Sequence, residues 1–338
     1  MRSTFCIVCL RESMKVFLDC DMRCMVTGAS GHLGSFLVRR LVDSGEDVCV
    51  LARPGSDLWR LAGFAHLLNV CRIELTDRKG LIEVFERAAP DVVFHLSWSG
   101  VTGANRHEGA HVRDNVVCSL EVLEAARLSG CSCWIGVGSQ AEYGPRSGPL
   151  SEDLPTRPVT SYGVSKLAVG LLAHKLCELG NMRFVWLRLL AAYGPMDSEA
   201  HLLPVVIRAL LAGRSPRLTA GGQLWDYLYV EDAADALLSV ARNEGARGIF
   251  VLGSGAARSI RSIVERVRDK IDPSLPLGLG VVPYPYDQVM HLEADISRLR
   301  ATTGWTPHVS LDQGLDKTID WYRTANQRRD TVLSGAYE

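Results

Sequence analysis

The chain has 338 residues, a formal net charge of −1 and a pI near 6.8. A nearly neutral chain has no surplus of Lys and Arg to neutralise a phosphate backbone, so we expect no nucleic-acid partner. Apolar residues make up 47%, enough for a large core, and the ten cysteines are scattered through predicted strands and helices. Cysteines scattered in this way indicate reduced thiols. Because Cys6-x-x-Cys9 has no second pair suited to zinc, we predict no metal site.

The first 21 residues fit no helix or strand. Their apolar run, Phe5 to Leu10, is too short for the core of a signal peptide, and Arg11 and Glu12 follow at once. No run reaches the roughly 18 apolar residues of a membrane span, so we expect a cytoplasmic protein without membrane contact. We predict a disordered extension at 1–21, a dinucleotide-binding domain at 22–195, a mainly substrate-binding lobe at 196–325 with elements that return to the main sheet, and a tail at 326–338.

A glycine-rich turn follows the first predicted strand, Cys24–Val26. The segment Thr27-Gly-Ala-Ser-Gly-His-Leu-Gly34 leads from this strand into an apolar repeat of helical period. Gly28 permits the tight turn, Gly31 lets the backbone approach a pyrophosphate, and Gly34 lets the helix pack closely on the strand. Because a helix N-terminus also attracts an anion, this context predicts a dinucleotide site.

The second predicted strand, Asp47–Leu51, bears on the choice between NAD and NADP. It ends in Ala52-Arg53, where an acidic residue would bind the ribose hydroxyls of NAD. Ala52 has no group for that contact, whereas the Arg53 guanidinium suits the 2′-phosphate of NADP. We therefore predict NADP as the cofactor, with NAD as the alternative.

Strands and helices alternate through most of the chain. This order is typical of a Rossmann-type, doubly wound parallel sheet in an α/β protein, here with a smaller C-terminal α/β lobe for the substrate. Ligands of such sheets bind at the carboxyl ends of the strands, where Ser97, Ser99 and Ser139 fall. The predicted strands are 70–75, 92–96, 133–137, 185–190 and 226–230, and the predicted helices are 77–88, 112–128, 201–212, 232–242 and 258–270.

Tyr162 and Lys166 stand four residues apart at the start of an apolar-periodic segment. On a helix the two side chains share one face, although the spacing alone also fits a chance pair on a solvated surface. A tyrosine loses its proton near pH 10 unless a nearby cation stabilises the phenolate. Hydride transfer at a carbinol carbon requires a proton to leave or join its oxygen, so Tyr162 is the candidate acid and base.

Taken together, the motifs make the chain similar to the extended short-chain dehydrogenases/reductases. Within that family it resembles the NAD-dependent epimerase/dehydratase group, which acts on nucleotide-activated sugars. The likeness covers about 23–322. The motifs are Thr27-Gly-x-x-Gly31-x-x-Gly34, Asn115-Val116, Ser139 with Tyr143-Gly144, Tyr162-x-x-x-Lys166, Tyr193-Gly-Pro195, Asp226-Tyr-Leu-Tyr-Val-Glu-Asp232 and Gly304-Trp-x-Pro307.

The resemblance implies roles for individual residues. Tyr162 would be the acid and base, Lys166 would lower its pKa and hold the nicotinamide ribose, and Ser139 would hydrogen-bond the reacting oxygen. It further implies a homodimer. We expect substrate contacts from Ser99, Gln140 and Trp225, whose ring can stack on a base or a sugar, with packing as the alternative role. The expected cofactor contacts are Gly28, Ser30, Gly31, His32, Leu33, Gly34, Arg53, Glu74, Leu75, Leu96, Ser97, Tyr162 and Lys166.

Departures from the family pattern narrow the reaction. Dehydratases of the family carry an Asp-Glu pair where this chain has Gln140 and Ala141, and decarboxylases need a glutamate at Ala141. Neither side chain can do acid/base work, which leaves 4-epimerisation or the reduction of a keto group.

The expected diphosphate clamp is also altered. Trp225 replaces the arginine that often precedes the aspartate, and no Lys or Arg occurs between Ile271 and Ser297. The possible substitutes are Arg208, Arg214 and Arg217. We therefore predict an NAD(P)-dependent reductase of a 4-keto group on a nucleotide-activated deoxysugar. The alternatives are an NAD-dependent nucleotide-sugar 4-epimerase, a reductase of a non-sugar ketone and a non-catalytic NADP-binding protein.

Overall fold

A seven-stranded parallel sheet forms the centre of the computed structural model, which describes residues 22–100, 106–285 and 288–334. All neighbouring strands in it run parallel. In their order across the sheet they are β10 (Gly248–Leu252), β6 (Arg183–Leu189), β5 (Cys133–Ser139), β4 (Val92–His95), β1 (Arg23–Thr27), β2 (Asp47–Ala52) and β3 (Asn69–Arg72). From β1 the chain builds the sheet outward through β2 to β3, and it then returns to the other side of β1 and continues outward from β4 to β10. This reversal between β1 and β4 is the doubly wound arrangement predicted from the sequence. The prediction for 1–21 lies outside the described residues.

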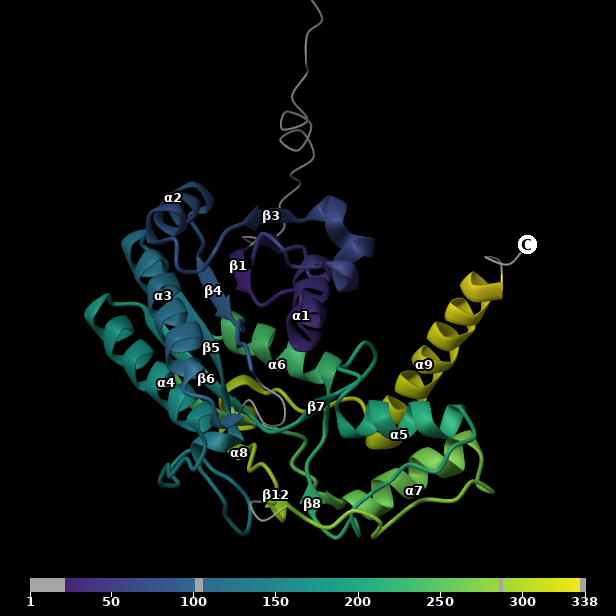
Figure 1. Cartoon of the computed structure of the whole chain (residues 1–338). Coiled ribbons are helices and arrows are strands. Elements are labelled where there is room, and N and C mark those ends of the chain that lie inside the picture. Colours follow the sequence, from purple (N-terminus) through teal and green to yellow (C-terminus); the bar gives the residue numbers. More distant parts are fainter. Residues whose placement is uncertain (1–21, 101–105, 286–287, 335–338) are drawn as a thin grey trace, which may run out of the picture.

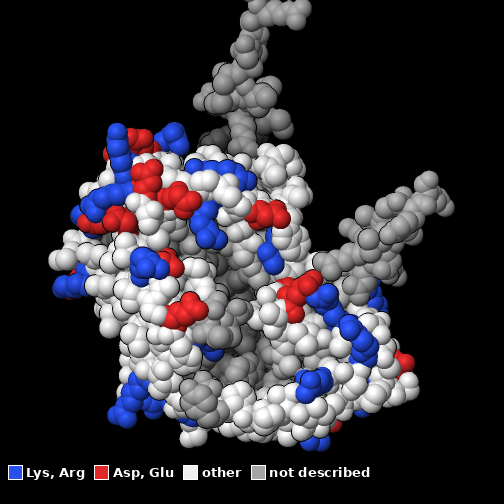
Figure 2. All heavy atoms as spheres, in the orientation of Figure 1, with Lys and Arg blue, Asp and Glu red and all other residues white. Residues whose placement is uncertain are grey.

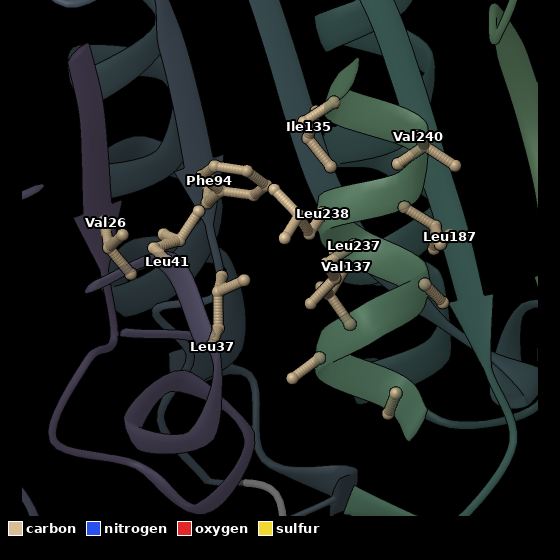
Figure 3. Close-up of a cluster of buried hydrophobic side chains, with 14 of the residues drawn as sticks. Val26, Leu37, Leu41, Phe94, Ile135, Val137, Leu187, Leu237, Leu238 and Val240 are labelled. Atoms are coloured by element: carbon tan, nitrogen blue, oxygen red, sulfur yellow. The ribbon is translucent and has the colours of Figure 1, made fainter. Parts of the chain in front are cut away.

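Helices cover both faces of this sheet (Figure 1). On one face lie α1 (His32–Asp43) and α6 (Val230–Arg242), and on the other lie α2 (Arg78–Ala88), α3 (Cys118–Leu128) and α4 (Ser161–Leu179). Figure 3 shows Leu37 and Leu41 of α1 and Leu238 of α6 gathered near Phe94 of β4. These side chains are almost fully buried, so the two helices close one half of the core over the sheet.

A smaller lobe lies at the lower right of Figure 1. Its helices α5 (Leu202–Leu211), α7 (Ile260–Ile271) and α9 (Leu311–Ser334) share a separate apolar cluster. A three-stranded sheet of β11 (Arg258–Ser259), β8 (Leu224–Trp225) and β12 (His291–Leu292) and a pair of β7 (Ala192–Tyr193) with β9 (Leu228–Tyr229) join it to the main body. The remaining elements are α8 (Ser297–Thr303) and the short helices η3 (Trp59–Leu67), η5 (Val112–Val117) and η6 (Gln140–Glu142).

Several boundaries differ from the predicted elements. The helix predicted at 112–128 begins as a π-helical turn, η5, and only then continues as α3. Of the strand predicted at 226–230, only Leu228–Tyr229 is extended, as β9, and Val230 already begins α6. The buried Asp226 carboxylate before β9 accepts hydrogen bonds from the backbone N–H groups of Ser254, Gly255 and Ala294. α6 and β10 return to the main sheet, and α9 continues beyond 325. The exact domain boundaries therefore stay a prediction.

Among the described residues, no helix is long and apolar enough to cross a bilayer. The same ranges hold no group of three or more His, Cys, Asp and Glu side chains suited to a metal ion. The cysteines placed there are free thiols. Lys and Arg side chains are interspersed with Asp and Glu on the face that Figure 2 shows.

Candidate active site

Two pockets meet at the glycine turn between β1 and α1. The first, of about 580 Å³, is lined by the ends of β1, β2 and β4 and by part of η5. The second, of about 550 Å³, opens between the sheet and the lobe, where the surface is hollowed in Figure 2. Gly28, Gly31, Leu96 and Trp98 line both pockets. A long ligand can therefore extend from one pocket into the other past the start of α1.

The glycine turn has the geometry that a dinucleotide needs. Gly28 has a φ of +71°, and a Cβ there would lie 2.7 Å from the Leu96 carbonyl carbon. A Cβ on Gly34 would lie 2.2 Å from the Gly28 oxygen, so α1 can approach β1 only through a glycine. The N-cap of α1 is Gly31, which has no side chain that could cap the helix. The first backbone N–H groups of α1 are therefore suited to a pyrophosphate, and these residues fit a nicotinamide dinucleotide.

The first pocket contains the residues predicted at the adenosine end. Arg53, Glu74, Leu75, Ser97 and Ser30 all line it. The turn that presents Arg53 is fixed by Arg72, whose Nη1 donates to the carbonyl oxygens of Pro54 at 3.0 Å and Ser56 at 3.1 Å. The end of β2 offers Ala52 and no carboxylate. Ser99, predicted to contact substrate, also lies in this pocket, where its hydroxyl donates to Asn115 Oδ1 at 3.2 Å.

A chain of buried hydrogen bonds beneath this pocket was not predicted. Ser97 N–H donates to Thr27 Oγ1, which lies 3.0 Å from His95 Nδ1, and His95 Nε2 lies 2.9 Å from Ser119 Oγ. Ser119 Oγ itself donates to the Asn115 carbonyl at 2.7 Å, so His95 must carry its proton on Nε2 and accept from Thr27 through Nδ1. Burial, with a smaller contribution from Lys166, lowers the pKa of His95 to about 3. The imidazole is thus a neutral link between β1, β4 and α3.

The second pocket brings Ser139, Tyr162 and Lys166 together. Tyr162 is 5% exposed, and this burial raises its pKa, whereas its hydrogen bond with Ser139 and the nearby charge of Arg106 act in the opposite direction. Lys166 Nζ donates to the Val137 carbonyl at 2.7 Å. Burial lowers the pKa of Lys166 to about 7. The resemblance implied that Lys166 lowers the pKa of Tyr162; in this structure the groups that do so are Ser139 and Arg106.

Ser139 is held through both its backbone and its side chain. Its N–H donates to Glu142 Oε1 at 2.8 Å, and its Oγ accepts from Ala141 N–H at 3.2 Å, which caps η6. Glu142 in turn accepts from Arg188 Nε at 2.7 Å and from Trp186 Nε1 at 3.1 Å. All of these side chains are buried, so the position of the serine depends on a buried ion pair below it.

Sequence reasoning missed several side chains around Tyr162. The Arg106 guanidinium carbon lies 5.0 Å from the centre of the Tyr162 ring, and Lys166 Nζ lies 3.8 Å from the centre of the Trp98 ring. The Trp98 and His111 rings also meet Tyr162 edge-on, at 6.0 and 5.8 Å between ring centres. Trp98 directly follows Ser97 at the end of β4, a position that could have signalled it. Arg106 stands in a segment without periodicity, and no sequence signal marks it.

The remaining predicted residues also line the second pocket: His32, Leu33, Gly34, Gln140 and Trp225. The arginines considered as substitutes for the diphosphate clamp do not. Arg208 forms an ion pair with Glu199, and Arg214 and Arg217 are not among the lining residues. The side chains of this pocket that can carry positive charge are Arg106, Lys166, His32 and His201, with Asp197 among them as an acidic group.

Comparison with known proteins adds sequence relatives to this geometry. The chain is 29% identical over 320 residues to the UDP-glucose 4-epimerase of Mycolicibacterium smegmatis, an alignment that covers 90% of this chain and all of that one. It is 26% identical to the dTDP-glucose 4,6-dehydratase of Neisseria gonorrhoeae, over 91% of this chain and 97% of the other.

Solved structures agree with the fold. The UDP-glucose 4-epimerase of Thermotoga maritima, solved with UDP-glucose, superposes with a TM-score of 0.82 at 23% identity, over 89% of this chain and 99% of that one. The enzyme WbmG of Bordetella bronchiseptica, in complex with NAD and UDP, gives a TM-score of 0.79 at 25% identity, over 90% and 96%.

The family match spans the residues that build both pockets from β1 to the end of β10. Residues 24–253 match the family described as the NAD dependent epimerase/dehydratase family. This range includes the glycine turn, Ser139, Tyr162 and Lys166, which meet at the carboxyl ends of the parallel strands. The chain belongs to the NAD-dependent epimerase/dehydratase family of nucleotide-sugar enzymes.

Proposed function

We propose that the protein is a nucleotide-sugar 4-epimerase. Such an enzyme removes a hydride from C4 of the sugar and a proton from the C4 hydroxyl, then returns the hydride to the opposite face of C4 and the proton to the oxygen. The observation that carries this proposal is the buried Tyr162, which lies with Ser139 in a pocket continuous with the glycine turn. The sequence alone favoured a keto reductase, whereas the relatives favour the epimerase that ranked second.

The dinucleotide, when bound, supplies the acceptor and donor of the hydride. The protein's residues move and hold the proton. In its phenolate form Tyr162 takes the proton of the C4 hydroxyl as the hydride leaves, and it gives this proton back when the hydride returns. Ser139 hydrogen-bonds the same oxygen. Lys166, whose pKa is near 7, is positioned beside Trp98 to contact the ribose at the nicotinamide end.

Two neighbours of Ser139 argue against dehydration. Gln140 lines the pocket and Ala141 follows it, and neither has a proton to give or a basic group to accept one. Loss of water from the sugar requires an acid for the leaving hydroxyl and a base for the neighbouring proton. The site therefore suits reactions that change only the oxidation state and configuration of a carbinol carbon.

Reduction of a 4-keto sugar is a second candidate because of the first pocket. Arg53 lines that pocket while β2 ends in Ala52, a pair that suits the extra phosphate of NADP. A reductase must exchange its cofactor in every cycle, whereas an epimerase regenerates it in place. The two alternatives are thus an epimerase that regenerates bound NAD and a reductase that consumes NADPH.

The two candidates are separated by one pair of assays. Purified protein is incubated with UDP-glucose, UDP-galactose and their N-acetyl forms, with and without NAD, and the products are separated by chromatography. In parallel, a 4-keto sugar nucleotide is supplied with NADPH and its absorbance is followed. Interconversion of C4 epimers without net cofactor consumption supports the epimerase. Stoichiometric loss of NADPH without epimerisation would instead establish the reductase.

We also propose a homodimer through α3 and α4, which pack side by side on the main sheet. α4 exposes Val164, Leu171, Leu172 and Leu179, which are 50%, 61%, 41% and 70% exposed. Their spacing places them along one face of the helix, as in a helical packing surface. Light scattering with size-exclusion chromatography should give a dimer for the wild type, and Leu171→Glu should shift it toward the monomer.

A further inference from the structure

Two histidines share one buried carboxylate on the lobe side of the second pocket. Asp197 Oδ1 lies 2.8 Å from His201 Nδ1 and 3.3 Å from His32 Nδ1, and it also accepts from Ser198 N–H. The Asp197 side chain is 4% exposed, that of His32 is 14% exposed and that of His201 is 48% exposed. All three line the pocket, and the epimerase chemistry at Tyr162 uses none of them.

The two histidines differ in how accessible their second ring nitrogen is to a ligand. His32 Nε2 is buried and has no hydrogen-bond partner within the described ranges. His201 uses Nδ1 for Asp197, which leaves its Nε2 for the pocket. His201 is also the N-cap of the ten-residue helix α5 and makes no side-chain capping bond, while Leu202 and Leu203 at the start of α5 line the same pocket. Unpaired N–H groups at a helix N-terminus favour an anion.

The distribution of charge points to the same end of the pocket. Arg106 is engaged over the Tyr162 ring, and Lys166 is engaged by Val137 and Trp98, so both lie at the acid/base residue. Arg208 is paired with Glu199. On the lobe side of the pocket, the lining side chain that can carry a positive charge is therefore a histidine imidazolium.

We propose that His201, oriented by Asp197 at the N-terminus of α5, donates a charge-assisted hydrogen bond to the diphosphate of the substrate's nucleotide. This inference rests on the proposed function. His201, a titratable group, takes the place of the arginine clamp that the sequence lacks.

The electrostatic surroundings give the two rings different charges. The hydrogen bond with Asp197 raises the pKa of His201, with burial opposing it, whereas burial lowers the pKa of His32. His201 therefore keeps its proton to a higher pH than an ordinary histidine, and His32 loses its proton at a lower one. The groups that face this cluster come from several elements. They are Asp197 and Ser198 before α5, His32 at the start of α1, Arg60 of η3 through its charge, the Glu199–Arg208 pair, Tyr227 between β8 and β9, and Tyr322 of α9, which donates to the Asp197 carbonyl.

The inference predicts that nucleotide binding weakens as the pH rises through the pKa of His201. NAD-saturated protein, in which the cofactor's own pyrophosphate is already bound, is titrated calorimetrically with UDP at pH 6.0, 7.0 and 8.5. We expect the Kd of the wild type to rise about tenfold over this range, the value for loss of one charge-assisted contact. Uridine, which has no phosphate, should bind with a Kd that does not follow the pH.

Three variants make the test specific. His201→Gln should bind UDP about tenfold more weakly than the wild type at pH 6.0 and lose the pH dependence. His201→Lys keeps its charge to a higher pH and should bind equally well at pH 6.0 and 8.5. The matched control is His66→Gln in η3, an exposed histidine that lines neither pocket, and it should follow the wild type.

The outcomes separate this inference from the proposed function. If the wild type turns over sugar nucleotides and His201→Gln keeps the wild-type Kd and its pH dependence, the inference is wrong and the proposed function stands. If UDP binding titrates through His201 but no sugar nucleotide is turned over, the inference stands and the proposed function is wrong. Failure of the wild type to bind UDP or dTDP at any pH overturns the inference.

Discussion

The Glu142 carboxylate accepts a hydrogen bond from Arg188 at 2.7 Å, and the two side chains are only 1% and 4% exposed. The other carboxylate oxygen receives the backbone N–H of Ser139 at 2.8 Å. Arg188 also lies 4.6 Å from the centre of the Tyr143 ring. The ion pair therefore fixes the strand end from which Ser139 reaches the pocket, and it can be broken without touching any residue that lines the pocket.

Arg188→Met should lower the free energy of unfolding by about 3 to 5 kcal/mol, because the Glu142 charge is left buried without its partner. Chemical denaturation at pH 7 measures this. The control is Arg266→Met, which breaks the exposed pair with Asp312 and should cost about 1 kcal/mol or less. Equal small losses in the two variants would show that the buried pair contributes nothing to the stability of the site.

The buried Lys166 should give the cofactor-free protein a distinctive pH dependence. Its pKa falls from 10.5 to about 7 through burial, so between these values the unfolded chain holds a proton that the folded chain lacks. The contribution of Lys166 to stability therefore rises with pH, by up to about 1.4 kcal/mol per pH unit.

The comparison with Lys166→Met isolates this contribution from all other titrating groups. We expect the unfolding free energy of the wild type minus that of the variant to increase from pH 7 to pH 9.5 in denaturant titrations. The Val137 carbonyl loses its partner in the variant at every pH, which shifts the difference but not its slope. A difference that stays constant with pH would mean that Lys166 is charged in the folded protein.

Arg53 should discriminate between the two cofactors. Arg53→Ala is expected to weaken NADPH binding by about 1.5 to 3 kcal/mol, the value of a charge-assisted contact, with little change for NADH. Fluorescence titration of both cofactors against the wild type and the variant measures this. Equal losses for NADPH and NADH would show that Arg53 does not contact a 2′-phosphate, and preference of the wild type for NADH would favour the epimerase.

The parts of the site that the sequence predicted are those encoded over a few neighbouring residues. The glycine turn and the pair Tyr162 and Lys166 are local patterns, and each has a spacing that its helix or turn enforces. The parallel sheet was predictable for a similar reason, because each strand and its following helix carry their own periodicity.

Long-range contacts account for what the sequence did not predict. Arg106 comes to Tyr162, and Asp197 to His32, across intervals that no local period spans. Likewise the short apolar run of β10 does not reveal its neighbour, and its place at the edge of the sheet comes from its pairing with β6. Within the π-helical turn η5, the side-chain amide of Asn115 forms hydrogen bonds with Ser99 and His111. Such positions are set by tertiary packing, which a single sequence does not display.

Tyr162→Phe should lower the turnover number by at least about 100-fold, because the phenol proton is required for chemistry. UDP and NAD binding should stay near the wild-type level, since the tyrosine hydroxyl is not needed to hold either pyrophosphate. Calorimetry of both ligands, beside a thermal unfolding curve, verifies that the variant is folded. Loss of NAD binding together with activity would assign Tyr162 a structural role instead.

The most direct measurement uses a sugar nucleotide that carries deuterium at C4 of the sugar, incubated with the wild type and with Tyr162→Phe. Proton NMR and mass spectrometry follow both the configuration at C4 and the fate of the label. The proposed function predicts that the wild type interconverts the C4 epimers with the deuterium retained and no net consumption of cofactor, and that Tyr162→Phe does so at least about 100-fold more slowly. Wild-type rates in Tyr162→Phe, or a wild-type product whose C4 deuterium has been replaced by hydrogen from the solvent, would contradict it.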